Sequence, residues 1–120
     1  MGKAILGARI LVMGMTFKEN VADIRNSKVV DIINELKDFG VEVDVVDPYA
    51  DSEDVKKMYG FKLMEKPRDN YDAVVVAVSH DAYQGLDEKY FKSLTCDKAV
   101  LVDVKGMYRD KIHELKYWSL

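Results

Sequence analysis

The residues with the greatest chemical potential gather in one stretch, residues 14–27 (GMTFKENVADIRNS). It contains two cations, Lys18 and Arg25, among small polar residues. An apolar run that ends at Met13 precedes it, and an amphipathic run that begins near Val29 follows it. We therefore expect a strand-to-helix connection of an α/β domain, although most such connections have only about 2–6 residues. A long cationic loop over a strand end indicates an anion site.

Lys18 is the strongest candidate in this loop. Its ammonium group, close to a helix N-terminus, could meet phosphate or carboxylate oxygens together with backbone N–H groups and the helix dipole. Arg25 could hold a phosphate with its planar guanidinium group. The alternatives are a solvated surface lysine and, for Arg25, an ion pair with Asp23 or with a helix acid. Asp23 either orients Arg25 or caps the helix, and we expect the cap.

Other candidates lie beside this loop or at neighbouring strand ends. Phe17 could pack against a base or sugar ring, or anchor the loop to the core. Lys105 precedes Gly106, where a backbone without a side chain lets a cation approach a ligand; an exposed turn lysine is the alternative. His80 follows the central strand and is either catalytic or, as is commoner, hydrogen-bonded locally. Cys96 should lie at the opposite end of the sheet, so we expect no nucleophilic role for it.

No Ser-His-Asp arrangement and no set of residues with metal-ligand spacing is present in the sequence. We therefore expect no metal site and a binding site without an evident catalytic group. The dinucleotide fingerprint is also missing, because Gly14 stands alone and the next glycine is Gly40. The acid at the second strand end, Asp47, is too distant to complete that fingerprint. Direct binding of NAD at its usual place is not expected.

The elements that must position these residues follow from hydrophobic periodicity. Apolar runs predict strands at residues 9–13, 41–46, 61–64, 73–78 and 99–104. Amphipathic spacing and turn signals predict helices at residues 27–39, 54–59 and 87–94, and a last helix or turn at 108–115. In the first helix the apolar stripe comprises Val29, Ile32, Ile33, Leu36 and Phe39.

This alternation predicts a Rossmann-like three-layer αβα sandwich with a mostly parallel sheet. The expected strand order is 3-2-1-4-5, with 61–64 as the third strand at one edge. The order of the strands then reverses between the first strand and the strand at 73–78, so a crevice opens at their carboxyl ends. Three segments should border it: 14–27, 79–83 and 104–108.

Length and composition limit the function classes. A chain of 120 residues predicts a single domain, and 48% hydrophobic with 32% charged residues is the composition of a folded protein. A formal charge of −3 without clustered Lys and Arg argues against nucleic acid or an anionic membrane as partner. The longest apolar run, residues 73–78, is far shorter than the ~20 residues of a membrane span. A lone cysteine and the absence of a signal-peptide pattern lead us to expect a cytoplasmic protein.

Four ordered motifs carry a family resemblance: GMTFKENVADIRNSKVVDIINEL, VEVDVVDPYAD, YDAVVVAVSHDAY and LVDVKGMY. From about residue 10 to residue 108, the chain resembles the C-terminal domain of the UDP-glucose/GDP-mannose dehydrogenase family. It is most similar to the branch that oxidises UDP-N-acetylhexosamines to uronic acids for surface polysaccharides. The resemblance implies two NAD molecules per sugar, a thioester on a catalytic cysteine, an N-terminal NAD-binding domain and a helical middle domain that forms a homodimer.

The resemblance also implies roles for individual residues. Phe17 and Lys18 are similar to the family pair that contacts the UDP-sugar. Arg25, two residues after Asp23, is similar to an arginine that reaches the NAD pyrophosphate across the domain interface. UDP-glucose dehydrogenases have Asp-Gly-Arg where this chain has Asp103-Val104-Lys105, so the assignment of that arginine's phosphate contact to Lys105 stays open. The DVKG form resembles the N-acetylhexosamine branch.

The sequence lacks the glycine-rich NAD motif, the catalytic cysteine and the middle domain of that family. We therefore expect residues 1–120 to be one domain, excised from a longer enzyme with Met1 added, and to have no dehydrogenase activity alone. Its partners would be the remaining domains of that enzyme and its UDP-N-acetylhexosamine substrate. The alternatives are a stand-alone nucleotide-binding or regulatory module with the same fold, and a structural domain whose site is vestigial.

Overall fold

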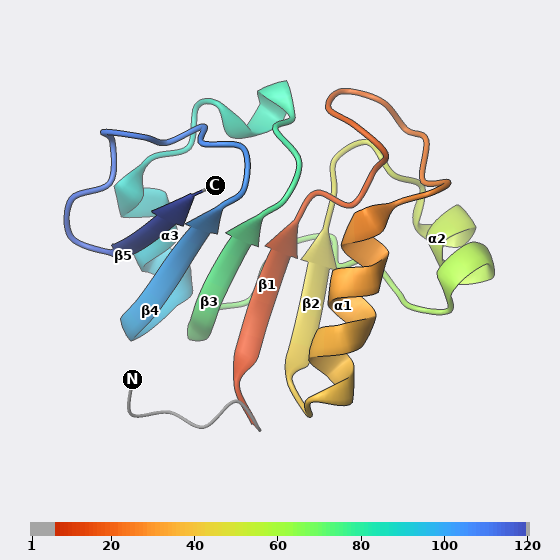
Figure 1. Cartoon of the computed structure of the whole chain (residues 1–120), viewed down its shortest axis with the longest axis horizontal. Coiled ribbons are helices and arrows are strands. Elements are labelled where there is room, and N and C mark those ends of the chain that lie inside the picture. Colours follow the sequence, from red (N-terminus) through yellow and green to blue (C-terminus); the bar gives the residue numbers. More distant parts are fainter. Residues whose placement is uncertain (1–6, 120) are drawn as a thin grey trace.

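Residues 7–119, which the computed structural model describes, form one five-stranded parallel sheet with helices packed on its two faces (Figure 1). The amino-terminal residues in which we expected an added Met1 and no signal peptide lie partly outside this range. The elements are β1 (Arg9–Met13), α1 (Lys28–Asp38), β2 (Glu42–Val46), α2 (Ser52–Tyr59), β3 (Tyr71–Val76), the 3-10 turn η1 (Asp81–Tyr83), α3 (Glu88–Leu94), β4 (Thr95–Asp103) and β5 (Lys116–Ser119).

The strands lie in the order β2-β1-β3-β4-β5, and each neighbouring pair is parallel. The α/β class is therefore confirmed, whereas the predicted order 3-2-1-4-5 is wrong at both edges. Residues 61–64 are not a strand: Met64 N–H donates to Val45 O at 2.8 Å, but Phe61 and Leu63 pack on one face of the sheet and Met64 on the other. The segment thus wraps around the β2 edge and does not continue the ladder.

The strand β5 at the other edge is not predicted by the sequence pattern. It pairs with the carboxyl half of β4, from Val100 opposite Lys116 to Asp103 opposite Ser119. The Tyr117 hydroxyl donates to the Asp103 carboxylate at 2.6 Å, which ties this edge to the buried end of β4. A strand of four residues has too few positions for its periodicity to stand out.

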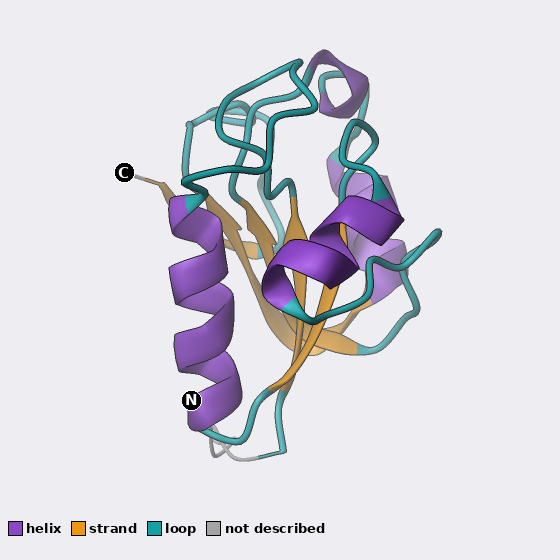
Figure 2. Cartoon of the chain, turned by 90° about the vertical axis from the view of Figure 1, so that its right-hand side faces the viewer, coloured by secondary structure: helices purple, strands orange, loops and turns teal. Residues whose placement is uncertain are grey.

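Two apolar clusters, one on each face of the sheet, form the core. On one face α1 and α2 contribute Val30, Ile33 and Val55, which pack against strand and loop residues; the buried set is Val12, Met15, Ile24, Val30, Ile33, Val45, Val55, Ala77 and Val78. On the other face α3 contributes Phe91 and Leu94; the buried set is Leu11, Met13, Val46, Tyr71, Val74, Val76, Tyr83, Phe91, Leu94, Leu101 and Tyr108. Figure 2 shows α1 on one side of the strands and the loops gathered above them.

The boundaries of α1 agree with the predicted range 27–39, but its buried stripe differs. Ser27 is the N-cap, and Gly40 follows the C-cap with φ +82°. Val30 and Ile33 face the sheet, whereas Ile32 and Phe39, expected in the stripe, are 46% and 59% exposed. At 100° per residue, Ile32 and Phe39 lie about 130° and 150° around the helix from the midpoint between Val30 and Ile33. The apolar arc of this helix is wider than the arc that the sheet covers.

The predicted reversal of strand order is present between β1 and β3, which are direct neighbours. Because the strands are parallel, the loops after β1, β2, β3 and β4 emerge at the same edge, the upper one in Figure 1. The side chain of Asp51 caps α2, because its carboxylate accepts the N–H groups of Glu53 and Asp54 at 2.9 and 3.2 Å.

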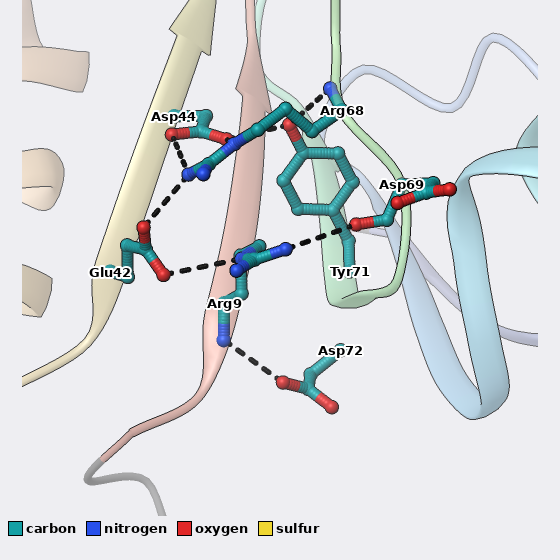
Figure 3. Close-up of polar contacts among 7 residues, drawn as sticks. All are labelled: Arg9, Glu42, Asp44, Arg68, Asp69, Tyr71 and Asp72. Carbon is teal, nitrogen blue, oxygen red and sulfur yellow. Dashed lines mark hydrogen bonds and ion pairs between the residues drawn. The ribbon is translucent and has the colours of Figure 1, made fainter.

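A polar cluster joins β1, β2 and β3 near their amino ends, at the end of the sheet opposite the 14–27 loop (Figure 3). The Arg68 guanidinium donates to both carboxylate oxygens of Asp44 at 2.9 Å and to Glu42 at 2.8 Å. Arg9 Nε donates to the other oxygen of Glu42 at 3.2 Å, and the Tyr71 hydroxyl donates to Asp44 at 2.7 Å. These contacts hold the polar turn at 65–70 against the sheet, far from the loops at the carboxyl ends.

Candidate functional site

The loop at 14–27 begins with a glycine that no other residue can replace without strain. Gly14 has φ +92°, and a Cβ atom there would lie 2.7 Å from Val78 Cβ. Its N–H donates to Val46 O at 2.8 Å, which fixes the loop against the end of β2. The close approach between the ends of β1 and β3 therefore needs glycine for packing. The phosphate-binding reason for glycine in a dinucleotide fingerprint does not apply, because this N–H is already bonded.

A buried Asp47–His80 pair holds the next part of the loop. The Asp47 carboxylate accepts Met15 N–H at 2.7 Å, Thr16 N–H at 3.3 Å and His80 Nε2 at 3.0 Å. His80 Nδ1 accepts the N–H of Asn20 at 2.9 Å. The side chains of Asp47 and His80 are both 0% exposed. The histidine is therefore hydrogen-bonded locally, which was the commoner of its two expected environments.

Most of the backbone N–H groups at the start of the loop are engaged inside the protein. Besides those of Gly14, Met15, Thr16 and Asn20, the N–H of Phe17 donates to Asp23 O at 2.7 Å. The Ser27 hydroxyl donates to Met15 O at 2.6 Å, so it does not cap α1. The N–H groups of residues 14–17 and 20 are therefore already used inside the protein and cannot form a phosphate cradle.

The tip of the loop presents Phe17 and Lys18 to solvent. Phe17 is 56% exposed, so it does not anchor the loop to the core; the buried Met15 and Ile24 do so instead. Lys18 is exposed, and its carbonyl accepts the Thr16 hydroxyl at 2.9 Å. An exposed aromatic ring beside an exposed ammonium group is an arrangement that can contact a planar base or sugar and a phosphate at the same time.

Arg25 forms the ion pair that was its alternative assignment. Its Nε and Nη2 atoms donate to the two carboxylate oxygens of Asp23 at 3.0 and 3.1 Å. The hydrogen bonds and charge of Arg25 hold the pKa of Asp23 below its ordinary value. Asp23 thus orients Arg25, and the expectation that Asp23 caps α1 is wrong, since Ser27 occupies that position.

A hollow of about 440 Å³ lies beside this pair. Residues 22–25 of the loop form one wall, and Asp54, Lys57 and Met58 of α2 form the other. The Tyr59 hydroxyl donates to Ile24 O, so this part of the loop is attached to α2. Arg25 is therefore held in a defined direction at the rim of a concave surface.

Lys105 lies on a separate turn after β4. The buried Asp103 carboxylate accepts the N–H groups of Met107 and Tyr108 at 3.0 and 2.7 Å, which closes this turn, and Gly106 has φ +72°. Lys105 itself is exposed. The turn is linked to the segment after β3, because the Tyr108 hydroxyl donates to Tyr83 O at 2.5 Å.

Hydrogen bonds thus join the predicted border segment 79–83 both to 14–27 and to 104–108. Residues 14–20 bond to His80 and Asp81, while the turn with Lys105 is linked to the far side of that segment through the Tyr108 hydroxyl. Cys96 lies at the start of β4, at the other end of the sheet, as expected. Within residues 7–119 no group of three or more His, Cys, Asp or Glu side chains could hold a metal ion.

Sequence reasoning missed the residues that organise this site. Asp47 accepts five hydrogen bonds from three different loops, yet sequence reasoning considered it only as the acid of a dinucleotide fingerprint and found it too distant for that role. The signal was present: an Asp directly before Pro48 at a strand end is typical of a side chain that accepts backbone N–H groups of its own turn. Asn20, with φ +62°, was not singled out either.

Comparison with known proteins bears on what this loop serves. The family model described as "UDP-glucose/GDP-mannose dehydrogenase family, UDP binding domain" matches residues 11–110, which include all of the candidate residues above. The chain belongs to this family.

No helix within residues 7–119 is long and apolar enough to cross a membrane.

Similar proteins are much longer than this chain. The chain is 38% identical to the UDP-N-acetyl-D-glucosamine 6-dehydrogenase of Pseudomonas aeruginosa over 111 residues. This matched region covers 92% of this chain and 26% of that protein. It is 40% identical to Protein CapL of Staphylococcus aureus over 107 residues, and this matched region covers 88% of this chain and 25% of that protein. The chain therefore spans about a quarter of the length of these family members.

Solved structures agree on the fold. An NDP-N-acetyl-D-galactosaminuronic acid dehydrogenase from Methanosarcina mazei Go1 superposes with a TM-score of 0.81 over 98% of this chain and 25% of the other, at 23% identity. A UDP-N-acetyl-mannosamine dehydrogenase, Cap5O from S. aureus, gives 0.75 over 94% of this chain and 26% of the other, at 21% identity. The Rossmann-like arrangement of the family is therefore present in this chain.

Proposed function

We propose that this chain is the UDP-sugar-binding C-terminal domain of a longer NAD-dependent dehydrogenase. The whole enzyme would be cytoplasmic and homodimeric, and would oxidise a UDP-N-acetylhexosamine to its uronic acid for surface polysaccharide synthesis. In this proposal Phe17, Lys18 and Lys105 contact the UDP-sugar. Arg25, oriented by Asp23, faces the pyrophosphate of NAD. The chain by itself carries no dehydrogenase activity.

One observation carries this proposal: the loop between β1 and α1 presents an exposed aromatic–cation pair from a backbone fixed by buried contacts. Phe17 and Lys18 lie at the edge of the sheet where the strand order reverses, the usual place for a ligand in an open α/β sheet. A loop held by internal hydrogen bonds, with two exposed side chains at its tip, suits a diphosphate linked to a ring. The identity to UDP-N-acetylhexosamine dehydrogenases supports the substrate class.

The chain's own first turn does not fit NAD. Gly14 N–H is bonded to Val46 O, and no second glycine allows a pyrophosphate to approach. Asp47, the acid at the end of the second strand, is buried and accepts five N–H groups, so its carboxylate is not free to bind a ribose hydroxyl. We therefore assign NAD mainly to another domain, with Arg25 as a contact from this one.

Titration of UDP against the isolated chain, followed by NMR, tests the proposal. We expect Lys18→Ala to weaken UDP binding by about 10- to 100-fold, because one charge-assisted hydrogen bond is worth about 1.5–3 kcal/mol. The matched control is Lys98→Ala, since Lys98 is also exposed but lies in the amino half of β4. Equal affinity of Lys18→Ala and the wild type would remove Lys18 from the site.

Two further comparisons separate the roles of the cations. Uridine, which lacks phosphates, should bind Lys18→Ala and the wild type with similar affinity if Lys18 contacts the diphosphate. Arg25→Ala should leave UDP affinity unchanged in the isolated chain, because its proposed ligand is held by another domain. A large loss of UDP affinity in Arg25→Ala would instead favour a stand-alone nucleotide-binding module in which this chain holds the whole ligand.

A further inference from the structure

We propose that Asp47 and His80 are positioning residues, which hold the Phe17–Lys18 tip in the conformation that binds the UDP-sugar. This inference rests on the proposed function. Neither side chain would touch the ligand, since both are completely buried. They would act on the tip through their hydrogen bonds to the loop backbone before and after it.

The Asp47 carboxylate is the point where three loops meet. One oxygen accepts from the loop after β1 and from His80, and the other accepts from the turn that follows β2 itself. Its five donors are Met15 N–H (2.7 Å), Thr16 N–H (3.3 Å), His80 Nε2 (3.0 Å), Tyr49 N–H (2.8 Å) and Ala50 N–H (3.1 Å). Four of these partners are backbone N–H groups, which can only donate, so an ionised carboxylate is the form that satisfies them.

The hydrogen bonds of His80 determine which ring nitrogen bears its proton. The N–H of Asn20 points at Nδ1 from 2.9 Å, so Nδ1 is the acceptor. Nε2 therefore carries the proton and donates to Asp47 at 3.0 Å. The ring is enclosed by the rings of Tyr49 and Tyr83, whose centroids lie 4.6 and 5.5 Å away. The neutral imidazole thus connects a carboxylate on one side to a backbone N–H on the other.

The two anchors bracket the tip. Asp47 fixes residues 15 and 16 before it, and His80 fixes Asn20 after it. Between these anchors the Thr16 hydroxyl donates to Lys18 O at 2.9 Å. At the second anchor the Asn20 side chain also takes part, because its Oδ1 accepts Asp81 N–H at 2.8 Å. Only residues 17–19 lie between the anchors. The direction of the Phe17 and Lys18 side chains is therefore set by a chain of bonds that starts at Asp47.

Two substitutions of His80 divide its functions. Asn places an amide oxygen near the position of Nδ1, so His80→Asn can still accept from Asn20. Gln places an amide nitrogen near Nε2, so His80→Gln keeps the donor to Asp47 but loses the acceptor for Asn20. We expect the Asn20 amide of His80→Gln to exchange its hydrogen at least about tenfold faster than in the wild type. The core amide of Val75 should exchange at an unchanged rate.

UDP affinity is measured on the same proteins. His80→Gln should bind UDP about five- to tenfold more weakly than the wild type, while His80→Asn should stay closer to it. Thr16→Val is the second variant, because it removes a hydroxyl outside the strands that donates to Lys18 O at 2.9 Å and lies 3.2 Å from His80 Nε2. It should also weaken UDP binding severalfold, and it decides the matter if the His80 variants fail to fold.

The outcomes are distinct. Equal exchange of the Asn20 amide in the wild type and His80→Gln would overturn the anchoring. A loosened loop with UDP affinity equal in the wild type, His80→Gln and Thr16→Val would overturn the positioning role. If the wild type itself bound no UDP, the proposed function would fail, and the exchange rates would still decide whether His80 holds the loop.

Discussion

Single residues of this domain have roles that their type alone does not reveal. Asp47 is an acid that accepts backbone N–H groups, and Asp23 is an acid that orients Arg25. From the sequence, Asp47 is only an acid too distant to complete a dinucleotide fingerprint, and Asp23 is expected to cap a helix. Phe17 is an aromatic residue left exposed beside an exposed lysine. At this scale, function follows from which groups remain free once internal bonds are satisfied.

Gly14 gives the sharpest prediction at the residue scale. Gly14→Ala should destabilise the domain by about 3 kcal/mol, because φ +92° is unfavourable for alanine and its Cβ would lie 2.7 Å from Val78 Cβ. Urea unfolding measures this loss. Gly85→Ala is the control: Gly85 lacks a positive φ, and a Cβ there meets no atom within 4 Å, so its effect should stay within about 0.5 kcal/mol. Similar losses in both variants would contradict the packing argument.

At the scale of elements, the helices begin and end by different means. The Asp51 and Asp87 side chains cap α2 and α3, whereas the Ser27 hydroxyl at the start of α1 bonds to the preceding loop. The N-terminus of α1 is thus tied to the site loop. Segment 61–64 and β5 lie at the two edges of the sheet. Few neighbouring elements determine the conformation of either segment.

Removing the cap of α2 should have a measurable cost. Asp51→Ala should lower the free energy of unfolding by about 1 kcal/mol, because the N–H groups of Glu53 and Asp54 lose their acceptor. The control is Asp38→Ala, since Asp38 is an exposed acid in the last turn of α1, where the helix dipole disfavours it. Asp38→Ala should be neutral or slightly stabilising. Equal destabilisation by both substitutions would argue against the cap.

At the scale of the whole molecule, the sheet has polar residues at both of its ends, and the two ends differ in how these residues are bonded. The loops at the carboxyl ends present exposed side chains, while the side chains of Arg9, Glu42, Asp44, Arg68 and Tyr71 at the other end are hydrogen-bonded to one another. Burial raises the pKa of Asp44, but hydrogen bonds from Arg68 and Tyr71 outweigh it, and the pKa lies below its ordinary value. Burial and the bond to Asp44 raise the pKa of Tyr71 to about 12.

Stability should therefore fall in acid, with a contribution from this cluster. Because the folded pKa of Asp44 lies below the ordinary value of 3.8, the carboxylate stabilises the fold above about pH 4, and this contribution is lost as pH falls through the folded pKa. Asp44→Asn cannot titrate there. We expect its loss of unfolding free energy between about pH 7 and about pH 3 to be smaller than that of the wild type by about 1 kcal/mol.

Thermal or urea unfolding at the two pH values measures the difference. Asp38→Asn serves as the control, because Asp38 is exposed and its carboxylate makes no hydrogen bond or ion pair among residues 7–119 that could be lost. Its acid sensitivity should match that of the wild type. An Asp44→Asn protein with an undiminished pH dependence would show that other carboxylates account for the acid response.

The sequence by itself determined the α/β class, four of the five strands, three helices, and the position of the 14–27 loop at the point where strand order reverses. These features depend on periodicity, caps and turns, which involve residues close together in the chain. The tertiary structure alone decided that the loop N–H groups are bonded to Asp47 and His80, that Arg25 pairs with Asp23, and that Arg68 closes the opposite end of the sheet. Except for the short Asp23–Arg25 pair, these contacts join residues more than twenty positions apart. Hydrogen-bond partners at such separations are chosen by packing, which a linear pattern does not encode.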